Sequence, residues 1–218
     1  EQYRPGVMRF ASEHGMAGLS FRVAEIIRKD TGVSWYGALY PHPQFHIDYD
    51  IDEALVWAIS RQESGFNPRA KSSAKAAGLM QLMPATASFI ARDRGYRGRK
   101  RHQLFEPELN LKLGQNYIQH LLDEPLVESS LIRLLAAYNG GPGNLRKWLG
   151  KVDHQDDPFL LVESMPARET RYYVKNVISN LGIYRQRFGE TTPALSGLAA
   201  GNGGKFVPSK AIDKGLAN

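Results

Sequence analysis

One glutamate, Glu63, occupies a position at which a carboxylate could serve as a proton donor. It follows Ile59 by four residues and Leu55 by eight, so it lies on the same face of a predicted helix as these apolar side chains. Burial disfavours the charged form of a carboxylate, and a glutamate that stays protonated near neutral pH can act as a general acid. The same position also suits a structural carboxylate that caps the helix or pairs with Arg61 or Arg69.

The helix that positions Glu63 has start and stop signals in the sequence. Asp50 followed by Glu53 is typical of a capping box, with Asp in place of the usual Ser or Thr. Gly65 suits the left-handed residue that ends a helix, and Pro68 prevents the helix from resuming. We therefore expect a helix that begins near Asp50 and ends before Gly65.

Three further segments stand out along the chain. They are GLMQLMP from Gly78 to Pro84, AYNGGPG from Ala137 to Gly143, and ETRYYV from Glu169 to Val174. Together with Glu63-Ser64 and in this order, they resemble the motifs of the soluble lytic transglycosylases. The resemblance extends over roughly two-thirds of the chain, from Asp50 to Gly189.

This resemblance implies an all-α, lysozyme-like fold, similar to the core of goose-type lysozyme, and a lyase that acts on peptidoglycan (murein) without a cofactor. Glu63 would protonate the oxygen that links N-acetylmuramic acid to N-acetylglucosamine, while the muramic acid N-acetyl group stabilises the cationic anomeric carbon. Glu63 would then act as a base on the 6-hydroxyl of the same sugar, which closes on the anomeric carbon to give a 1,6-anhydro product. No second carboxylate is required, unlike in most glycosidases.

The resemblance also implies seven substrate-binding residues, which are Ser72, Gln81, Met83, Tyr138, Asn139, Glu169 and Tyr173. Tyr138 would hydrogen-bond the N-acetyl group or the developing charge, and Glu169 would contact the substrate or orient Tyr138. Each has a structural alternative, since Tyr138 also suits a core aromatic and Glu169 a carboxylate favoured at a helix start. Glu163 is a second acidic candidate, which the spacing does not rank against Glu169.

Other chemistries find little support. The sequence has no cysteine for a thiol nucleophile or a disulfide, no Gly-x-Ser-x-Gly elbow, and neither a zincin nor a deaminase signature. His42 and His46 are four residues apart, but Pro43 breaks any helix between them, so we expect no metal site. Two alternatives to a transglycosylase remain, namely a muramidase that hydrolyses the same bond and a non-catalytic module that binds wall polymer or nucleic acid with a steep salt dependence.

The positive charge of the chain is local. Of the net charge of +6, a surplus of five lies between Arg92 and Arg101, where six Lys or Arg residues accompany Asp93 alone. This loop suits an anionic polymer such as nucleic acid, an acidic lipid surface or a wall bearing peptide carboxylates, or it has no partner at all. The resemblance favours peptidoglycan strands, with cell-wall or secretion machinery as further partners, rather than nucleic acid.

The 218 residues suggest one sizeable core with additions at both ends. We expect a helical lead-in at residues 1–46, a catalytic domain at 47–190 and a flexible tail at 191–218. No apolar run approaches the ~18 residues of a membrane span. A start at Glu1 rather than Met is consistent with a removed leader, and we expect a periplasmic monomer.

The apolar periodicity and the prolines predict the remaining helices. The lead-in should contain two short helices, whose apolar faces are Val7, Phe10 and Ala11, and then Leu19, Val23, Ile26 and Ile27. Helices should open at Pro84 and Pro107, after Ser129 or Ser130, at Asn144 and after Pro166. In the last of these, the expected core residues are Val174, Val177, Ile178, Leu181 and Phe188. We expect no strand, apart from a short pairing near residues 70–80, and a loop at 150–158.

Overall fold

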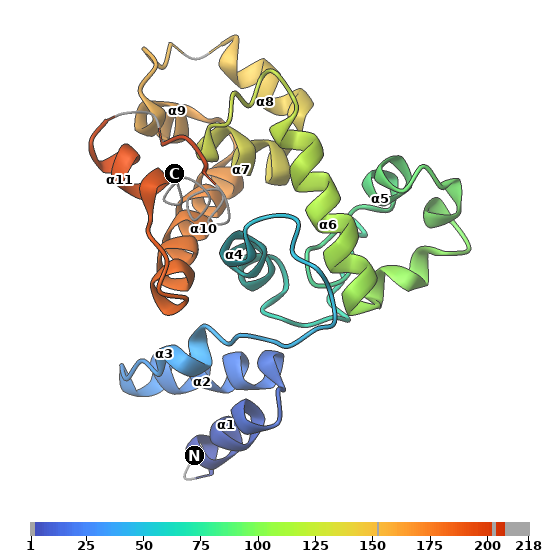
Figure 1. Cartoon of the computed structure of the whole chain (residues 1–218), viewed down its shortest axis with the longest axis vertical. Helices are drawn as coiled ribbons and strands as arrows, with labels where there is room; N and C mark the ends of the chain where they lie inside the picture. The colour runs from blue at the N-terminus through green and yellow to red at the C-terminus, as the bar shows by residue number, and fades with distance from the viewer. Residues whose placement is uncertain (1–2, 152, 202–203, 208–218) are drawn as a thin grey trace, which may run out of the picture. The chain divides into compact units, whose positions relative to one another are not determined.

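The computed structural model describes residues 3–151, 153–201 and 204–207. Over these ranges the fold is all-α, as expected, with eleven α-helices, two short 3-10 helices and isolated β-bridges in place of strands (Figure 1). Within them, no helix combines the length and the apolar character that crossing a bilayer requires.

The chain folds into two compact units that interleave in sequence. Unit 1 comprises residues 1–48 and 59–114, and unit 2 comprises 49–58 and 115–218. The described part of unit 1 contains α1 (Arg4–Glu13), α2 (Ala17–Thr31), α3 (Tyr36–Leu39), α5 (Pro84–Ile90), η1 (Arg94–Arg97) and η2 (Arg101–Phe105). That of unit 2 contains α7 (Leu131–Gly140), α8 (Pro142–Leu149), α9 (Pro158–Ser164), α10 (Arg168–Arg187) and α11 (Pro193–Ala199). Helices α4 (Glu53–Ser64) and α6 (Pro107–Leu122) have residues in both units.

Helix α4 begins at a different cap from the one that the sequence suggested. The side chain of Asp52, rather than that of Asp50, accepts a hydrogen bond from the backbone N–H of Leu55 at 3.0 Å, as an N-cap does. The backbone N–H of Asp50 instead donates to Oε1 of Gln115 at 3.0 Å. The predicted end is confirmed, because Gly65 follows α4 in the left-handed conformation with φ +56°.

The core of unit 2 is built around α7 and α10. Every residue of α7 from Leu131 to Tyr138 except Arg133 is buried, and α10 packs against it. Of the predicted core face of α10, Val174, Val177 and Leu181 are buried, whereas Ile178 and Phe188 are only partly covered. Two polar residues of α10, Asn180 and Arg185, are also buried in this core. Asn180 donates to Ala58 O and Arg185 to the carboxylate of Asp52, both in the segment 49–58.

The lead-in helices α1 and α2 pack through small residues. Ala11, Ser20 and Ala24 are fully buried between them, and the hydroxyls of Ser12 and Ser20 lie 2.7 Å apart. The apolar faces predicted for these helices are therefore correct at Ala11 and Ile27 and wrong at four larger residues, Val7, Phe10, Leu19 and Ile26, which are exposed.

One helix was not predicted, and part of the expected tail is also helical. Residues 153–157 form the expected loop, but α9 starts immediately after them, and the side chain of Asp157 caps it by accepting from the N–H groups of Phe159 and Leu160. In the expected tail, α11 buries Ala194 and Leu198, and the N–H of Phe206 donates to Ser129 O at 2.7 Å. Apolar contacts thus order this part of the tail despite its Gly- and Ala-rich composition. Residues 208–218 of the expected tail lie outside the described residues.

Candidate active site

Glu63 lies in the last turn of α4, at the edge of the buried part of that helix. Leu55 and Ile59, on the same face, are fully buried, whereas Glu63 is partly exposed. The shared face is therefore confirmed, and the full burial of Glu63 is not. A carboxyl group at such an edge is partly desolvated and still accessible to a ligand, as a group that must exchange a proton with a substrate requires.

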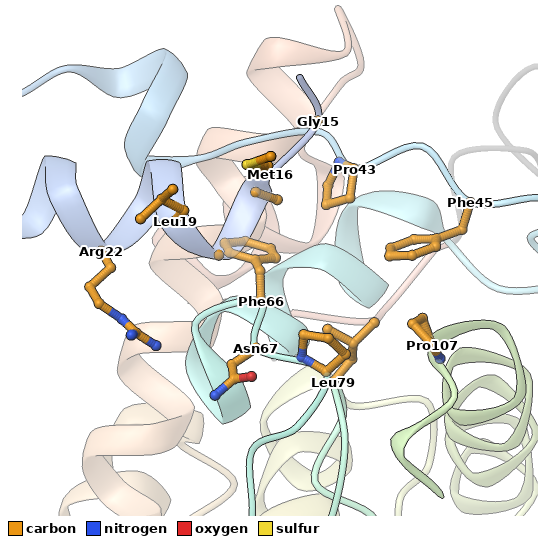
Figure 2. Close-up of a pocket in the computed structure, with 13 residues that line it drawn as sticks. Gly15, Met16, Leu19, Arg22, Pro43, Phe45, Phe66, Asn67, Leu79 and Pro107 are labelled. Atoms are coloured by element: carbon orange, nitrogen blue, oxygen red, sulfur yellow. The ribbon is translucent and has the colours of Figure 1, made fainter. Parts of the chain in front are cut away.

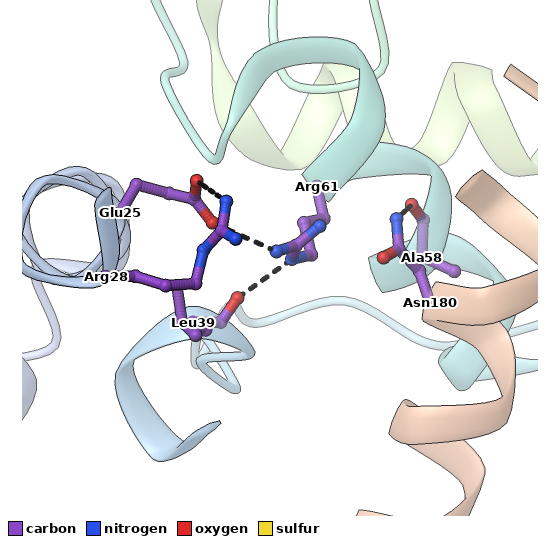
Figure 3. A network of polar contacts seen from close by, with 6 residues as sticks. All are labelled: Glu25, Arg28, Leu39, Ala58, Arg61 and Asn180. Atoms are coloured by element: carbon purple, nitrogen blue, oxygen red, sulfur yellow. Dashed lines mark hydrogen bonds and ion pairs between the residues drawn. The ribbon is translucent and has the colours of Figure 1, made fainter. Parts of the chain in front are cut away.

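The end of α4 is fixed to the lead-in helices through Arg61. Its Nε donates to Leu39 O at 2.9 Å, and its Nη2 lies 3.6 Å from Oε1 of Glu25 (Figure 3). The guanidinium also stacks over the rings of Tyr40 and Phe21, at 4.2 Å and 4.9 Å from their centroids. The packing of α2 and α3 thus sets the position of the helix end that carries Glu63.

The turn after α4 contains a strained residue. Phe66 is 3% exposed and has a φ of +62°, a conformation that costs a bulky side chain free energy. Its ring packs edge-on against Phe21 with the centroids 5.6 Å apart. Gly18 allows this packing, because a Cβ there would lie 2.8 Å from the carbonyl oxygen of Phe66.

An apolar pocket of about 370 Å³ lies beside this turn in unit 1 (Figure 2). Phe66, Asn67 and Pro68 form part of its wall, and residues of α2 and of the segment before α4 form another part. None of the predicted site residues lines it. A second pocket, of about 200 Å³ in unit 2, also contains none of them.

The loop that contains Gln81 forms the short pairing that was left open at residues 70–80. Ala77 makes antiparallel bridges to Lys71 and to Leu82. Gln81 has a φ of +46°, and its side-chain nitrogen donates to Ala70 O at 3.0 Å and to Gly78 O at 2.8 Å. These bonds hold the amide in place and orient its oxygen away from the loop's own carbonyls.

The two other predicted residues of unit 1 lie at the ends of this loop. The hydroxyl oxygen of Ser72 accepts from the N–H of Ala76 at 3.0 Å and closes a tight turn. Met83 precedes α5 as its N-cap residue and is 39% exposed. Both side chains therefore have access to solvent, as ligand-binding groups need.

Asn110, which the sequence did not single out, holds the loop from behind. This buried side chain accepts from the N–H of Met80 at 2.8 Å and donates to Ala77 O at 2.9 Å and to Leu104 O at 2.8 Å. Gly78 makes the close approach possible, because it has a φ of +82° and a Cβ there would lie 2.3 Å from the Asn110 amide. Gly114 in turn allows the side chain of Met80 to pack closely against α6.

We expect Asn110→Ala to lower the free energy of unfolding by about 2–3 kcal/mol, because it leaves the N–H of Met80 and the carbonyl of Leu104 without their partner. The carbonyl of Ala77 loses one of its two donors, since it also accepts from the N–H of Leu82. Urea unfolding followed by circular dichroism measures this loss. Asn116→Ala, an exposed position on the same helix, is the matched control, with an expected change of less than about 0.5 kcal/mol. Equal stabilities of the two variants would contradict the role of Asn110.

In unit 2, the structure brings two of the predicted tyrosines together and adds a third. The ring of Tyr138 lies parallel to that of Tyr173, with 6.5 Å between centroids, and 5.3 Å from that of Tyr117. Burial raises the pKa of Tyr117 to about 12, so its hydroxyl keeps its proton at neutral pH. Nothing in the sequence indicated the contact between Tyr117 and Tyr138.

Asn139 is bonded to Thr170, the residue that follows Glu169 in the sequence. The hydroxyl of Thr170 donates to Oδ1 of Asn139 at 2.7 Å, so the end of α7 is bonded to the first turn of α10. Glu169, the neighbour of Thr170, is exposed. Glu163 is also exposed, but it forms an ion pair with Lys175 at 2.8 Å, and this cation lowers the pKa of Glu163. The two acidic candidates of this region therefore differ in that Glu163 is engaged by Lys175.

No three His, Asp or Glu side chains gather in the described ranges in a way that could hold a metal ion. Nδ1 of His42 lies 3.4 Å from the side-chain nitrogen of Gln44. The predicted site residues carry amides, hydroxyls and carboxylates, which are groups that hydrogen-bond sugars.

The all-α fold with these features is lysozyme-like. The sequence profile described as Transglycosylase SLT domain matches residues 46–159, just over half of the chain. The chain therefore belongs to the Transglycosylase SLT domain family.

Named relatives agree with this assignment. The chain is 41% identical over 150 residues to the soluble lytic murein transglycosylase of Salmonella typhimurium and 39% identical over 148 residues to that of Escherichia coli. Each match covers 67% of this chain and 23% of the relative, so the chain corresponds to about a quarter of those proteins.

Solved structures show the same similarity. The crystal structure of the 70 kDa soluble lytic transglycosylase of Escherichia coli superposes with a TM-score of 0.74 and 32% identity, over 85% of this chain and 30% of that one. A structure described as an inactive glutamate-to-glutamine mutant of the Pseudomonas aeruginosa enzyme has a TM-score of 0.68 and 29% identity, over 84% and 30% of the two chains. A complex of the 70 kDa enzyme with bulgecin A has a TM-score of 0.73 and 31% identity, over 86% and 31%.

Proposed function

We propose that this chain is a peptidoglycan lytic transglycosylase and that Glu63 is its only catalytic carboxylate. The observation that carries the proposal is the placement of Glu63, partly buried at the end of α4 and inside the segment that matches the family. The inactive glutamate-to-glutamine mutant of the Pseudomonas aeruginosa relative supports a catalytic glutamate in this family. Murein in the names of the relatives supports peptidoglycan as the substrate.

The proposed reaction uses Glu63 twice. Its protonated carboxyl first gives a proton to the oxygen between N-acetylmuramic acid and N-acetylglucosamine, and the bond from that oxygen to the anomeric carbon breaks. The substrate's own N-acetyl group stabilises the positive charge that develops on this carbon. The carboxylate of Glu63 then takes the proton of the 6-hydroxyl, whose oxygen bonds to the anomeric carbon. The proton that Glu63 lost is thereby replaced, and no water is consumed.

Partial burial suits this double role. A fully solvated carboxylic acid would lose its proton at neutral pH, and a fully buried one could not reach a sugar. At the edge of the buried face of α4, Glu63 combines reduced solvation with access.

The predicted substrate-binding residues would contact the glycan through side-chain groups that are positioned by contacts with their neighbours. The hydroxyl of Ser72, the amide oxygen of Gln81 and the thioether of Met83 line one part of the glycan site. The ring of Tyr138 contacts two aromatic neighbours, and its hydroxyl would hydrogen-bond the N-acetyl group or the developing charge. Asn139, Glu169 and Tyr173 complete the set, and Glu169 either contacts the glycan or orients Tyr138.

Product analysis tests this proposal against hydrolysis of the same bond. Digested peptidoglycan is separated and its muropeptides are weighed by mass spectrometry. A transglycosylase yields 1,6-anhydromuramic acid ends, which are one water lighter than the reducing ends that a muramidase yields. If only reducing ends appeared, the proposed transglycosylase chemistry would be wrong, whereas the assignment of peptidoglycan as the substrate would still hold.

We further propose that the protein works as a monomer in the periplasm, where its substrate is located. Relatives named as soluble lytic murein transglycosylases support this location. Cell-wall or secretion machinery would be its protein partners.

A further inference from the structure

The positive charge of this protein is concentrated in one segment that includes the Gln81 loop. Residues 69–101 contain nine Lys or Arg and one acidic residue, Asp93, which gives a net charge of +8. Because the whole chain carries +6, the rest of it carries 6 − 8 = −2. A charge imbalance of this size within one segment produces a strong local positive potential.

Most of these cations are directed to solvent. Seven are exposed, namely Arg69, Lys71, Lys75, Arg92, Arg94, Arg97 and Arg99, and we refer to them as the basic patch. Within the described part of the chain, none of the seven side chains forms an ion pair or a hydrogen bond. The two other cations of the segment have local partners, since Lys100 pairs with Asp93 and Arg101 donates to Lys75 O. The patch therefore retains its charge for an external anion.

The backbone beneath the patch is well braced. Asp93 accepts from the N–H of Gly95 at 2.7 Å and from Nζ of Lys100 at 2.6 Å. Lys100 also lowers the pKa of Asp93, so this brace is charged at neutral pH. Tyr96 and Leu104 are buried beneath the loop. Arg94, Arg97 and Arg99 thus project from a defined frame.

The same frame is joined to the proposed glycan-binding loop. Asn110 donates both to Leu104 O, in η2, and to Ala77 O, in the loop. Arg101 donates to the carbonyl of Lys75, three residues after Ser72, at 3.4 Å. Helix α5 connects the two parts directly, since it begins after Met83 and ends before Arg92. The patch and the loop therefore belong to one braced segment of unit 1.

We propose that the basic patch binds the carboxylates of the peptide stems that project from the peptidoglycan strand. This inference rests on the proposed function, which places a glycan strand at the Gln81 loop. Peptide stems carry free carboxylates at short intervals along such a strand, and arginine bonds carboxylates in a bidentate manner. Nucleic acid and anionic lipid would match the charge equally well, but neither would account for the link between the patch and the loop.

Binding is best measured without cleavage, in a Glu63→Gln background. The test variant carries Arg94→Gln, Arg97→Gln and Arg99→Gln. The matched control removes three exposed cations outside the segment through Lys112→Gln, Lys147→Gln and Arg187→Gln. Each protein is sedimented with insoluble peptidoglycan and, in parallel, with glycan strands from which an amidase has removed the peptides.

We expect the test variant to bind intact peptidoglycan about tenfold more weakly than the control variant, because three exposed charge contacts are lost. This difference should largely vanish above about 0.5 M salt, where exposed charges are screened. On peptide-free strands, the two variants should bind equally. Equal binding to intact peptidoglycan, or an equal loss on both substrates, would overturn the proposal.

The same variants address the other anionic partners. A loss of binding to double-stranded DNA or to vesicles containing phosphatidylglycerol, with peptidoglycan binding unchanged, would reassign the patch and overturn the proposal. Failure of the proposed function is a separate result, because it would appear as missing anhydro products in the protein with Glu63 intact.

Discussion

Replacing Glu63 with glutamine is expected to reduce the release of soluble muropeptides from peptidoglycan by a factor of about 10²–10⁴, the usual contribution of a general acid or base. Glutamine has nearly the same shape as protonated glutamate, but it cannot transfer a proton. Both proposed steps depend on this one side chain, since the same carboxyl protonates the leaving oxygen and later accepts the proton of the 6-hydroxyl. The rate of release, measured on purified sacculi, gives the effect.

The control for this variant is Glu163→Gln. Glu163 is exposed and paired with Lys175, so its loss should change turnover by less than about twofold, because exposed ion pairs contribute little. Circular dichroism and binding to peptidoglycan should be unchanged in Glu63→Gln. Near-normal turnover in Glu63→Gln would exclude it as the acid, and inactivity of Glu163→Gln with an intact fold would show that the acidic residue is misassigned.

The second large effect concerns the buried ion pair between Arg185 and Asp52. Both side chains are about 1% exposed, and the guanidinium also donates to Thr191 O at 3.0 Å and to Val207 O at 2.7 Å. Arg185→Met leaves the carboxylate of Asp52 buried without its cation. We expect this substitution to lower the free energy of unfolding by about 3–5 kcal/mol.

Urea unfolding of the single and double variants tests this expectation. Arg187→Met changes an exposed arginine two residues away and should cost less than about 0.5 kcal/mol. Adding Asp52→Asn to Arg185→Met should recover part of the loss, because the unpaired charge is then removed while an N-cap side chain remains for α4. If the double variant is no more stable than Arg185→Met, the unpaired charge is not the cause.

The helices that the sequence predicted well are those with strong local signals. Pro84 and Pro107 each occupy the first position of a helix, and Ser130 caps α7, as expected. Gly65 ends α4 because it adopts a positive φ without a steric cost. In each case the physical cause lies within a few residues of the position, so the chain itself contains the information.

Features that depend on distant partners were missed. The N-cap of α4 is Asp52 rather than the predicted Asp50, because the backbone N–H of Asp50 donates to Gln115, 65 residues away. The positive φ of Phe66 depends on packing against Phe21 and on close contact with Gly18. Such contacts leave no periodic or compositional trace in a single sequence.

The candidate site was predicted from the resemblance more than from physical pattern. Periodicity placed Glu63 on the buried face but overstated its burial, because position on a face does not determine how far the covering layer extends. Tyr117 and Asn110 were missed as neighbours of site residues, since an inward aromatic and a buried amide look like ordinary helix residues. The ion pair between Glu163 and Lys175, twelve residues apart, also could not be predicted from the spacing.

The interleaving of the two units restricts how the gene can be shortened. Residues 49–58 precede most of unit 1 in sequence but fold with the segment after 114. A fragment that stops at residue 114 would lack three hydrogen-bond partners of the segment 49–58. Gln115 accepts from the N–H of Asp50, Asn180 donates to Ala58 O, and Arg185 donates to Asp52. A fragment made of residues 1–114 or of residues 115–218 should therefore be unstable. A fragment that folds on its own would need residues 49–58 joined to the segment after 114.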